Sequence, residues 1–274
     1  MIGIIGAGTM GKGIAIEFAR FNHKVVLISV ERHLSKQMLH DEVLRLTEKY
    51  SFENKEDIIN NIETTNVYND LIDCNLIIEA VSEDLDKKRN SLNEAKEYIC
   101  ENTIVASNTS SLSIKDIFSG IIPLERVVGL HFFNPVQIMK LIELSFLDES
   151  SQFIINEARK YAESIEKEVV LVKNSPGFIV NRLLIPMINE AARIVDEGIA
   201  TIEDIDRAMK FGANHPMGPL RLSDLIGNDI TLAILNVLNV KNNNLKISNG
   251  LKEKVESSQL GRKSGIGFYE YRRK

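Results

Sequence analysis

Short runs of consecutive apolar residues alternate with helix-like stretches along the first 174 residues of the chain. The first run, residues 2–5, is followed over residues 10–21 by apolar side chains at helical spacing, among them Ile14 and Phe18. Later apolar runs lie at 24–29, 76–78, 104–106, 127–128 and 169–172, and helical patterns lie at 85–99 and 153–165. Apolar strands separated by helices are typical of a parallel sheet that is covered on both faces. The pattern therefore predicts an α/β domain.

The pattern changes at residues 174–177, where Pro176 and Gly177 interrupt it. From Phe178 onward the sequence favours helices and shows no convincing strand. The predicted helices cover 178–196, which Pro186 should kink, then 202–211 and 225–238, and a polar surface loop is expected at 241–249. We therefore predict two domains, an α/β domain over residues 1–174 and a smaller all-α domain over residues 175–274.

Composition and charge narrow the class of protein. The 274 residues carry 33 Lys+Arg and 38 Asp+Glu, a formal net charge of −5, which argues against a general electrostatic grip on nucleic acid or anionic lipid. No apolar stretch is long enough for a membrane span. The two cysteines, Cys74 and Cys100, have neither a disulfide framework nor metal-ligand spacing. We therefore expect a cytoplasmic protein with no metal and no nucleic acid or membrane partner.

A glycine-rich turn follows the first apolar run. Residues 6–11 read Gly-Ala-Gly-Thr-Met-Gly, between a predicted strand and a predicted helix. In a dinucleotide-binding turn, Gly6 permits the tight bend, Gly8 lets the backbone approach a pyrophosphate, and Gly11 lets helix and strand pack closely. The helix N-terminus adds N–H donors and a partial positive charge. The turn predicts a Rossmann-type domain, with cofactor contacts from residues of the turn, namely Gly6, Gly8, Thr9, Met10 and Gly11.

The residue that selects between NAD and NADP is expected about 20 residues further on, at the end of the second strand. Ser29 occupies this place instead of an acid, and Glu31 and Arg32 follow. A serine removes the repulsion of a 2′-phosphate, and Arg32 could pair with that phosphate, which would favour NADP. If Glu31 replaces the missing acid, the cofactor is NAD. Both options remain open at this point.

Several ordered motifs identify a family. The chain resembles the 3-hydroxyacyl-CoA dehydrogenases, in particular the short bacterial 3-hydroxybutyryl-CoA dehydrogenases, from Gly3 to Tyr271. The motifs that carry the resemblance lie at 6–11, 78–80, 106–111, 129–135, 139–141, 176–182, 214–219 and 261–269. Composition and periodicity alone indicate only a two-domain, dinucleotide-dependent protein.

His131 and Glu143 are the candidates for proton transfer. A histidine suits this task because its unperturbed pKa is about 6.5. Glu143 lies inside an apolar run, where a carboxylate is costly unless it has a partner, and as the partner of His131 it would fix the tautomer and stabilise the imidazolium. The alternative is a satisfied core histidine and an exposed glutamate. The resemblance favours the catalytic interpretation, since His131 matches the family's base.

The resemblance implies further site residues. Ser110 and Asn181 match the polar pair around the substrate oxygen, although a helix cap and a solvent-facing position are the structural alternatives. Because these two residues belong to different predicted domains, the site is expected in the cleft between the domains. Lys49 is the candidate for the CoA phosphates, with Lys55 as its competitor. The residues that the resemblance places at the cofactor are Glu83, Lys88, Asn134 and Lys263.

Together these observations predict a reversible oxidoreductase. It would convert (S)-3-hydroxyacyl-CoA, in particular 3-hydroxybutyryl-CoA, to 3-oxoacyl-CoA with NAD or NADP, in fatty acid or butyrate metabolism. The resemblance also implies a homodimer formed through the helical domain. Two alternatives remain: a hydroxyacid or sugar-acid dehydrogenase that does not use CoA, and a dinucleotide-binding protein of this fold without turnover.

Overall fold

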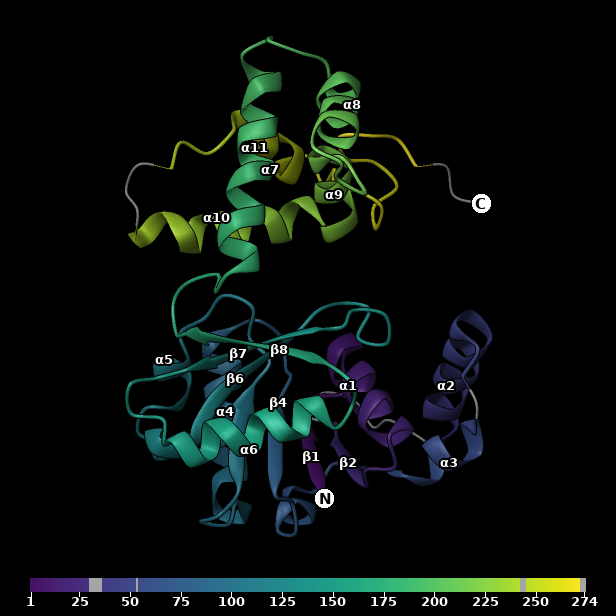
Figure 1. The fold of residues 1–274 in the computed structure, drawn as a ribbon, viewed down its shortest axis with the longest axis vertical. Coiled ribbons are helices and arrows are strands. Elements are labelled where there is room, and N and C mark those ends of the chain that lie inside the picture. Colours follow the sequence, from purple (N-terminus) through teal and green to yellow (C-terminus); the bar gives the residue numbers. More distant parts are fainter. Residues whose placement is uncertain (30–35, 53, 242–244, 272–274) are drawn as a thin grey trace. The chain divides into compact units, whose positions relative to one another are not determined.

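A computed structural model of the chain describes residues 1–29, 36–52, 54–241 and 245–271. The chain divides into two compact units, Met1–Phe178 (unit 1) and Ile179–Lys274 (unit 2), which are drawn in Figure 1. Each unit is described by itself below. The predicted fold class, a Rossmann-type α/β unit followed by a helical one, is confirmed.

Unit 1 is built on one eight-stranded sheet. The strands are β1 (Ile2–Ile5), β2 (Val25–Ile28), β3 (Ile62–Thr65), β4 (Leu76–Glu79), β5 (Ile104–Ser107), β6 (Val127–Phe132), β7 (Leu141–Phe146) and β8 (Glu168–Lys173). Their order in the sheet is β3-β2-β1-β4-β5-β6-β7-β8. The direction of winding reverses between β1 and β4, and in open α/β sheets this is the place where ligands bind at the carboxyl ends of the strands.

The expectation of a parallel sheet needs one correction. All neighbouring strands are parallel except β6 and β7, which are antiparallel. The connection between them is short, residues 133–140, whereas a parallel pair needs a crossover of a dozen or more residues. The predicted set of strands also lacked β7, noted only as an apolar run around Glu143, and β3, where Ile62 alone is buried and the apolar signal is accordingly weak.

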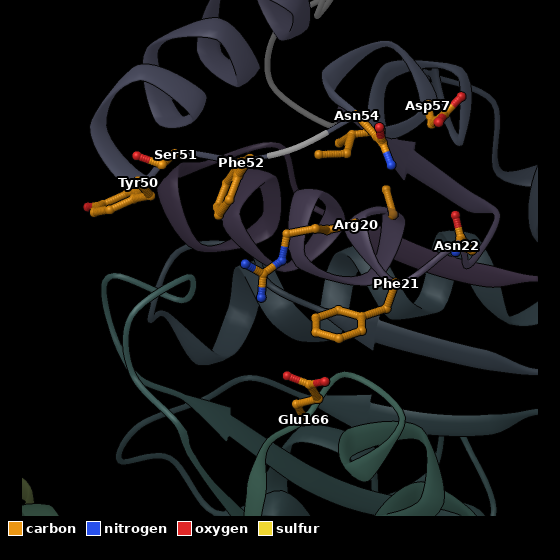
Figure 2. A pocket seen from close by; sticks show the side chains of 11 residues that line it. Arg20, Phe21, Asn22, Tyr50, Ser51, Phe52, Asn54, Asp57 and Glu166 are labelled. Carbon is orange, nitrogen blue, oxygen red and sulfur yellow. The ribbon is translucent and has the colours of Figure 1, made fainter.

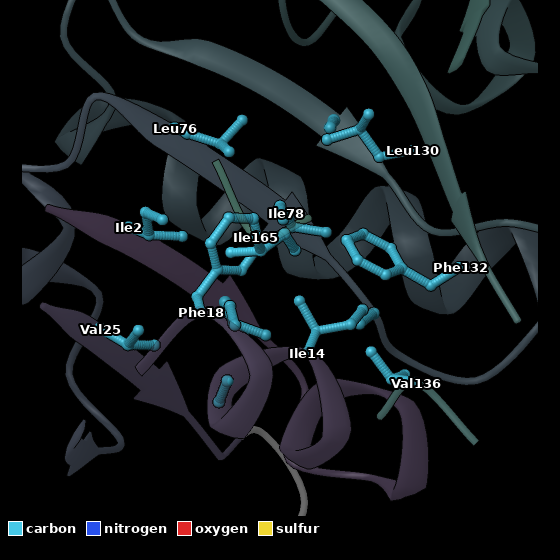
Figure 3. Close-up of a cluster of buried hydrophobic side chains, with 14 of the residues drawn as sticks. Ile2, Ile14, Phe18, Val25, Leu76, Ile78, Leu130, Phe132, Val136 and Ile165 are labelled. Atoms are coloured by element: carbon cyan, nitrogen blue, oxygen red, sulfur yellow. The ribbon is translucent and has the colours of Figure 1, made fainter. Parts of the chain in front are cut away.

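Helices cover both faces of the sheet. The helices of unit 1 are α1 (Thr9–Arg20), α2 (Lys36–Tyr50), α3 (Lys55–Asn60), α4 (Leu85–Ala95), α5 (Ile114–Phe118) and α6 (Gln152–Glu163), with short 3-10 turns η1 (Tyr68–Leu71), η2 (Lys96–Tyr98) and η3 (Leu124–Arg126). One core cluster joins Ile14 and Phe18 of α1 to strand residues such as Ile78 (Figure 3). A separate cluster contains Ile77 and Leu92. Adjacent residues of one strand thus enter different cores, as the period of two requires.

Unit 2 contains helices α7 (Val180–Asp196), α8 (Ile202–Gly212), α9 (Pro219–Ile226), α10 (Asn228–Lys241) and α11 (Asn249–Glu256). Their shared core includes Ile188, Leu220 and Leu235. The prediction of one helix over 225–238 is wrong, because Gly227 has a φ of 110° and separates α9 from α10. Part of the predicted loop at 241–249 lies outside the described residues. In the described part of the chain, no helix is both long and apolar enough to cross a bilayer.

Candidate active site

The glycine-rich turn between β1 and α1 is shaped by its glycines. Gly6 has a φ of 110°, and a Cβ placed there would lie 2.8 Å from the backbone of Ala80 at the end of β4. A Cβ on Gly11 would overlap the carbonyl oxygen of Gly6. The tight bend and the close packing of α1 against the turn therefore both require glycine.

The geometry of this turn fits a pyrophosphate. Gly8 caps α1, no side chain caps this helix end, and no acidic residue lies in the first turn. A Cβ on Gly8 would meet no protein atom within 4 Å, so Gly8 borders open space in front of the helix N-terminus. Thr9 is also exposed there. Unsatisfied N–H groups and the helix dipole favour an anion at this place, which lies where the sheet order reverses.

Ser29 directly follows β2, and its backbone N–H donates to the carbonyl oxygen of Thr65 at 2.9 Å. It therefore lies at the strand end that was predicted to select the cofactor. Glu31 and Arg32 lie outside the described residues. Their predicted roles at the ribose or at a 2′-phosphate stay predictions.

His131 and Glu143 face each other across the antiparallel pair β6–β7. The two residues are direct partners in the strand register, which places both side chains on the same side of the sheet. His131 Nδ1 lies 2.8 Å from Glu143 Oε2, and the side chains are 7% and 1% exposed. The rings of Phe133 and Phe178 lie 4.4 and 5.7 Å from the imidazole, centroid to centroid. The structure therefore brings the predicted proton-transfer pair together.

This pairing determines what the imidazole can do. A carboxylate accepts a hydrogen bond from Nδ1–H, which leaves Nε2 as the nitrogen that accepts or gives a proton. The negative charge of Glu143 also stabilises the imidazolium. The end of β6 next to His131 is held as well, because the Asn108 side-chain oxygen accepts a 2.9 Å hydrogen bond from the Phe132 N–H.

Glu83 organises the turn after β5 that contains Thr109, Ser110 and Ser111, here named the serine turn. Its Oε1 accepts bonds from Thr109 Oγ1 at 2.7 Å, Ser110 N at 2.8 Å and Ser111 N at 2.9 Å, and it also accepts from both serine hydroxyls. Burial by itself would raise the pKa of Glu83. The Lys88 ammonium and the donors of the serine turn outweigh that effect, and the pKa lies below its ordinary value. An ionised Glu83 therefore fixes the position of Ser110.

Glu79, at the end of β4, completes this network and was missed in the sequence. Lys88 is 1% exposed, and its Nζ lies 2.9 Å from Glu79 Oε1 and 3.4 Å from Glu83 Oε2. Ser107 Oγ donates to Glu79 Oε2 at 2.5 Å, and burial raises the pKa of Glu79 although Lys88 opposes this. The bonds of Lys88 hold Glu79 and Glu83, so its predicted cofactor contact stays a prediction. The sequence signal that could have revealed Glu79 was a carboxylate directly after an apolar run, which resembles the signal of Glu143 inside its own apolar run.

The remaining predicted residues are spread over the chain. Asn134 is exposed in the loop that follows His131, and Lys49 is exposed in the last turn of α2. Asn181, in the first turn of α7, and Lys263, whose Nζ lies 2.6 Å from Asp229, belong to unit 2. Their predicted roles, and their joint action with His131, stay predictions.

A cavity of about 400 Å³ lies beside the C-terminal end of α1 (Figure 2), and Lys49 Nζ lies 4.9 Å from the ring centre of its lining residue Tyr50. The Arg20 guanidinium there lies 4.8 Å from the ring centres of both Phe21 and Phe52. The carboxylates of Asp57 and Glu166 also line the cavity. The lining thus presents charges of both signs, and the predicted role of Lys49 at the CoA phosphates stays a prediction.

The class of protein follows from these features: a dinucleotide-binding α/β unit with a buried histidine–carboxylate pair near the same sheet edge defines a dehydrogenase. Residues 1–175 match the family model of the 3-hydroxyacyl-CoA dehydrogenase NAD binding domain, and residues 177–271 match that of the 3-hydroxyacyl-CoA dehydrogenase C-terminal domain. The chain belongs to the 3-hydroxyacyl-CoA dehydrogenase family.

Individual relatives resemble the chain over nearly its full length. A 3-hydroxybutyryl-CoA dehydrogenase of Clostridioides difficile is 44% identical over 284 residues, covering 98% of this chain and 99% of the relative. One from Bradyrhizobium diazoefficiens is 38% identical, with 99% and 95% covered. The crystal structure of (S)-3-hydroxybutyryl-CoA dehydrogenase PaaH1 from Ralstonia eutropha superposes with a TM-score of 0.93 at 38% identity, covering 99% of each chain.

Proposed function

We propose that the protein is an NAD-dependent dehydrogenase that interconverts (S)-3-hydroxyacyl-CoA and 3-oxoacyl-CoA, with 3-hydroxybutyryl-CoA as the expected substrate. The observation that carries the proposal is the buried His131–Glu143 pair, at 2.8 Å, in a unit that also presents an open glycine-rich turn. Membership of the family and the similarity to 3-hydroxybutyryl-CoA dehydrogenases support the choice of substrate.

The mechanism assigns one task to each group of side chains. In the oxidative direction, His131 takes the proton of the 3-hydroxyl at Nε2, while Glu143 holds Nδ1 and stabilises the imidazolium. When bound, NAD supplies the acceptor for the hydride that leaves C3 of the substrate. The turn at Gly6–Gly11 would hold the cofactor diphosphate, with Asn134 and Lys263 as further predicted contacts. Glu83 positions Ser110, which we expect to bind the substrate oxygen together with Asn181.

The test is reduction of acetoacetyl-CoA, followed by the loss of reduced-nicotinamide absorbance. Turnover supports the proposal, and the product should be the (S)-3-hydroxybutyryl-CoA enantiomer. Turnover of free hydroxyacids without CoA would instead support the hydroxyacid or sugar-acid alternative. Binding of NADH with no turnover of any acyl-CoA or hydroxyacid would support the non-catalytic alternative.

Cofactor preference depends on the end of β2. The match of residues 1–175 to an NAD binding domain supports NAD, and we expect the wild type to prefer NADH. In Ser29→Asp, a carboxylate would repel the 2′-phosphate of NADPH, so the ratio of kcat/KM for NADH over NADPH should rise about tenfold, or about 1.4 kcal/mol. Ser29→Asn is the matched neutral control and should leave the ratio near that of the wild type. An unchanged ratio in Ser29→Asp would mean that another position selects the cofactor.

We also propose that the protein forms a homodimer through unit 2. Large apolar side chains on several of its helices are exposed, including Leu183, Phe211 and Val240. Exposed apolar side chains are candidates for an interface. Size-exclusion chromatography with light scattering should therefore give twice the chain mass, and a single-chain mass at micromolar concentration would contradict the dimer.

Three further proposals follow from the sequence and its family resemblance. The protein acts in the cytoplasm, it serves fatty acid or butyrate metabolism, and Lys49 binds the phosphates of CoA.

A further inference from the structure

Lys167 is a buried lysine with three partners, directly before β8. Its side chain is 4% exposed, and its Nζ lies 2.6 Å from Glu17 Oε1. Nζ also donates to the carbonyl oxygens of Val136 at 2.7 Å and Met139 at 3.1 Å. An ammonium removed from water is costly unless its donors are satisfied, and here all three have an acceptor. The surroundings of Lys167 Nζ therefore satisfy a buried ammonium group at the end of a lysine side chain.

Both carbonyl partners lie in the connection between β6 and β7, residues 133–140, here named the hairpin loop. This loop begins two residues after His131 and contains Asn134, the predicted contact of the cofactor. Lys167 thus holds two carbonyl groups of the loop with one ammonium. Lys167 therefore restrains the part of the hairpin loop that directly follows Asn134 and Pro135.

The hairpin loop is also held on α1. Gln137 Nε2 donates to the carbonyl oxygen of Gly13 at 3.0 Å. A Cβ on Gly13 would lie 3.1 Å from Val136 Cγ2, so the loop packs closely against this part of the helix. Glu17, four residues and about one helical turn beyond Gly13 on the same face of α1, binds Lys167. The helix that begins at the glycine-rich turn and the loop that leaves the histidine strand are therefore joined at both Gln137 and Lys167.

We propose that Lys167 is a positioning residue for the dinucleotide. It holds the hairpin loop against α1, so that Asn134 and the glycine-rich turn keep one fixed separation along the cofactor. Its role is separate from proton transfer, because its ammonium binds Glu17 and the carbonyl oxygens of Val136 and Met139, and these do not belong to the His131–Glu143 pair. The proposal rests on the proposed function, in which NAD binds at the glycine-rich turn.

The test is the variant Lys167→Met, which keeps the length of the side chain and removes the ammonium. We expect the Kd for NADH, measured by isothermal titration calorimetry, to rise about tenfold, because binding must then supply the free energy that orders the released loop. KM for NADH should rise with it, while KM for acetoacetyl-CoA should change less than twofold. A merely structural role would lower the fraction of folded protein, and hence the binding stoichiometry, without changing Kd.

Two further variants keep the test decisive. Glu17 Oε1 also accepts from Arg20 Nη2 at 3.2 Å, so in Lys167→Met the buried carboxylate keeps this partly exposed arginine but loses its buried lysine. The double variant Glu17→Gln/Lys167→Met removes the carboxylate charge as well, and it should regain thermal stability but not NADH affinity. Lys173→Met removes an exposed lysine of β8 that pairs with Asp148, and it should bind NADH as the wild type does. Wild-type NADH affinity in Lys167→Met, or in the double variant, would overturn the proposal. Absence of acetoacetyl-CoA turnover in the wild type would overturn the proposed function instead.

Discussion

Replacing His131 with Gln should lower kcat for acetoacetyl-CoA reduction by about 10²–10⁴-fold, the usual contribution of general acid–base catalysis. The reason is the loss of Nε2, the only ring nitrogen that the bond to Glu143 leaves for proton transfer. The hydride step itself does not need the imidazole, so NADH affinity should stay within twofold of the wild type. Steady-state kinetics together with calorimetric NADH binding measure both expectations.

His131→Asn separates proton transfer from the stability of the buried pair. The Asn amide nitrogen occupies the place of Nδ1 and still donates to Glu143, whereas Gln leaves this 0% exposed glutamate with a displaced partner. The unfolding temperature of His131→Asn should therefore lie closer to that of the wild type than the unfolding temperature of His131→Gln does. Both variants should lose the same share of kcat. If Asn restored most of the activity, Glu143 packing rather than proton transfer would explain the loss. A near-normal kcat in His131→Gln would show that His131 does not transfer the proton.

Local patterns indicated the parts of the site that depend on neighbouring residues in the chain, and the family resemblance decided between the catalytic and the structural interpretation of His131 and Glu143. The glycine-rich turn was found because its spacing between a strand and a helix is itself the geometric requirement. Glu143 became a candidate because a carboxylate in an apolar run is costly unless it has a partner, and the family resemblance favoured His131 as that partner; the strand register brings the two together. In both cases a physical constraint acts on a few consecutive residues and leaves a mark in the sequence.

Contacts between distant segments left no such mark. Lys88 reads as part of an ordinary charged helix start, and only the folded chain brings it against Glu79. Lys167 likewise reads as a surface lysine after α6, although it closes a buried pair with Glu17 from the other end of unit 1. The direction of β7 and the break between α9 and α10 are a different case, because the length of the hairpin loop and the backbone of Gly227 are local features that hydrophobic periodicity does not report. Periodicity reports which face is buried, not which segment covers it.

Replacing Gly8 with Ala should weaken NADH binding at least tenfold while leaving the stability of the protein nearly unchanged. The added Cβ meets no protein atom within 4 Å, so the folded chain accepts it. A poorer helix cap and a less flexible unfolded chain are small and opposite effects, which together change the free energy of unfolding by less than about 1 kcal/mol. The methyl group does occupy the space in front of the α1 N-terminus, where the diphosphate is expected.

Gly11→Ala supplies the contrast that makes this prediction specific. Its Cβ would overlap the carbonyl oxygen of Gly6, and since both groups belong to rigid backbone, α1 must shift. We expect Gly11→Ala to lose about 1–3 kcal/mol of stability, the usual cost of overpacking, in addition to NADH affinity. Chemical denaturation and calorimetric NADH binding distinguish the two variants. Wild-type NADH affinity in a stable Gly8→Ala protein would show that the cofactor diphosphate does not lie against the glycine-rich turn.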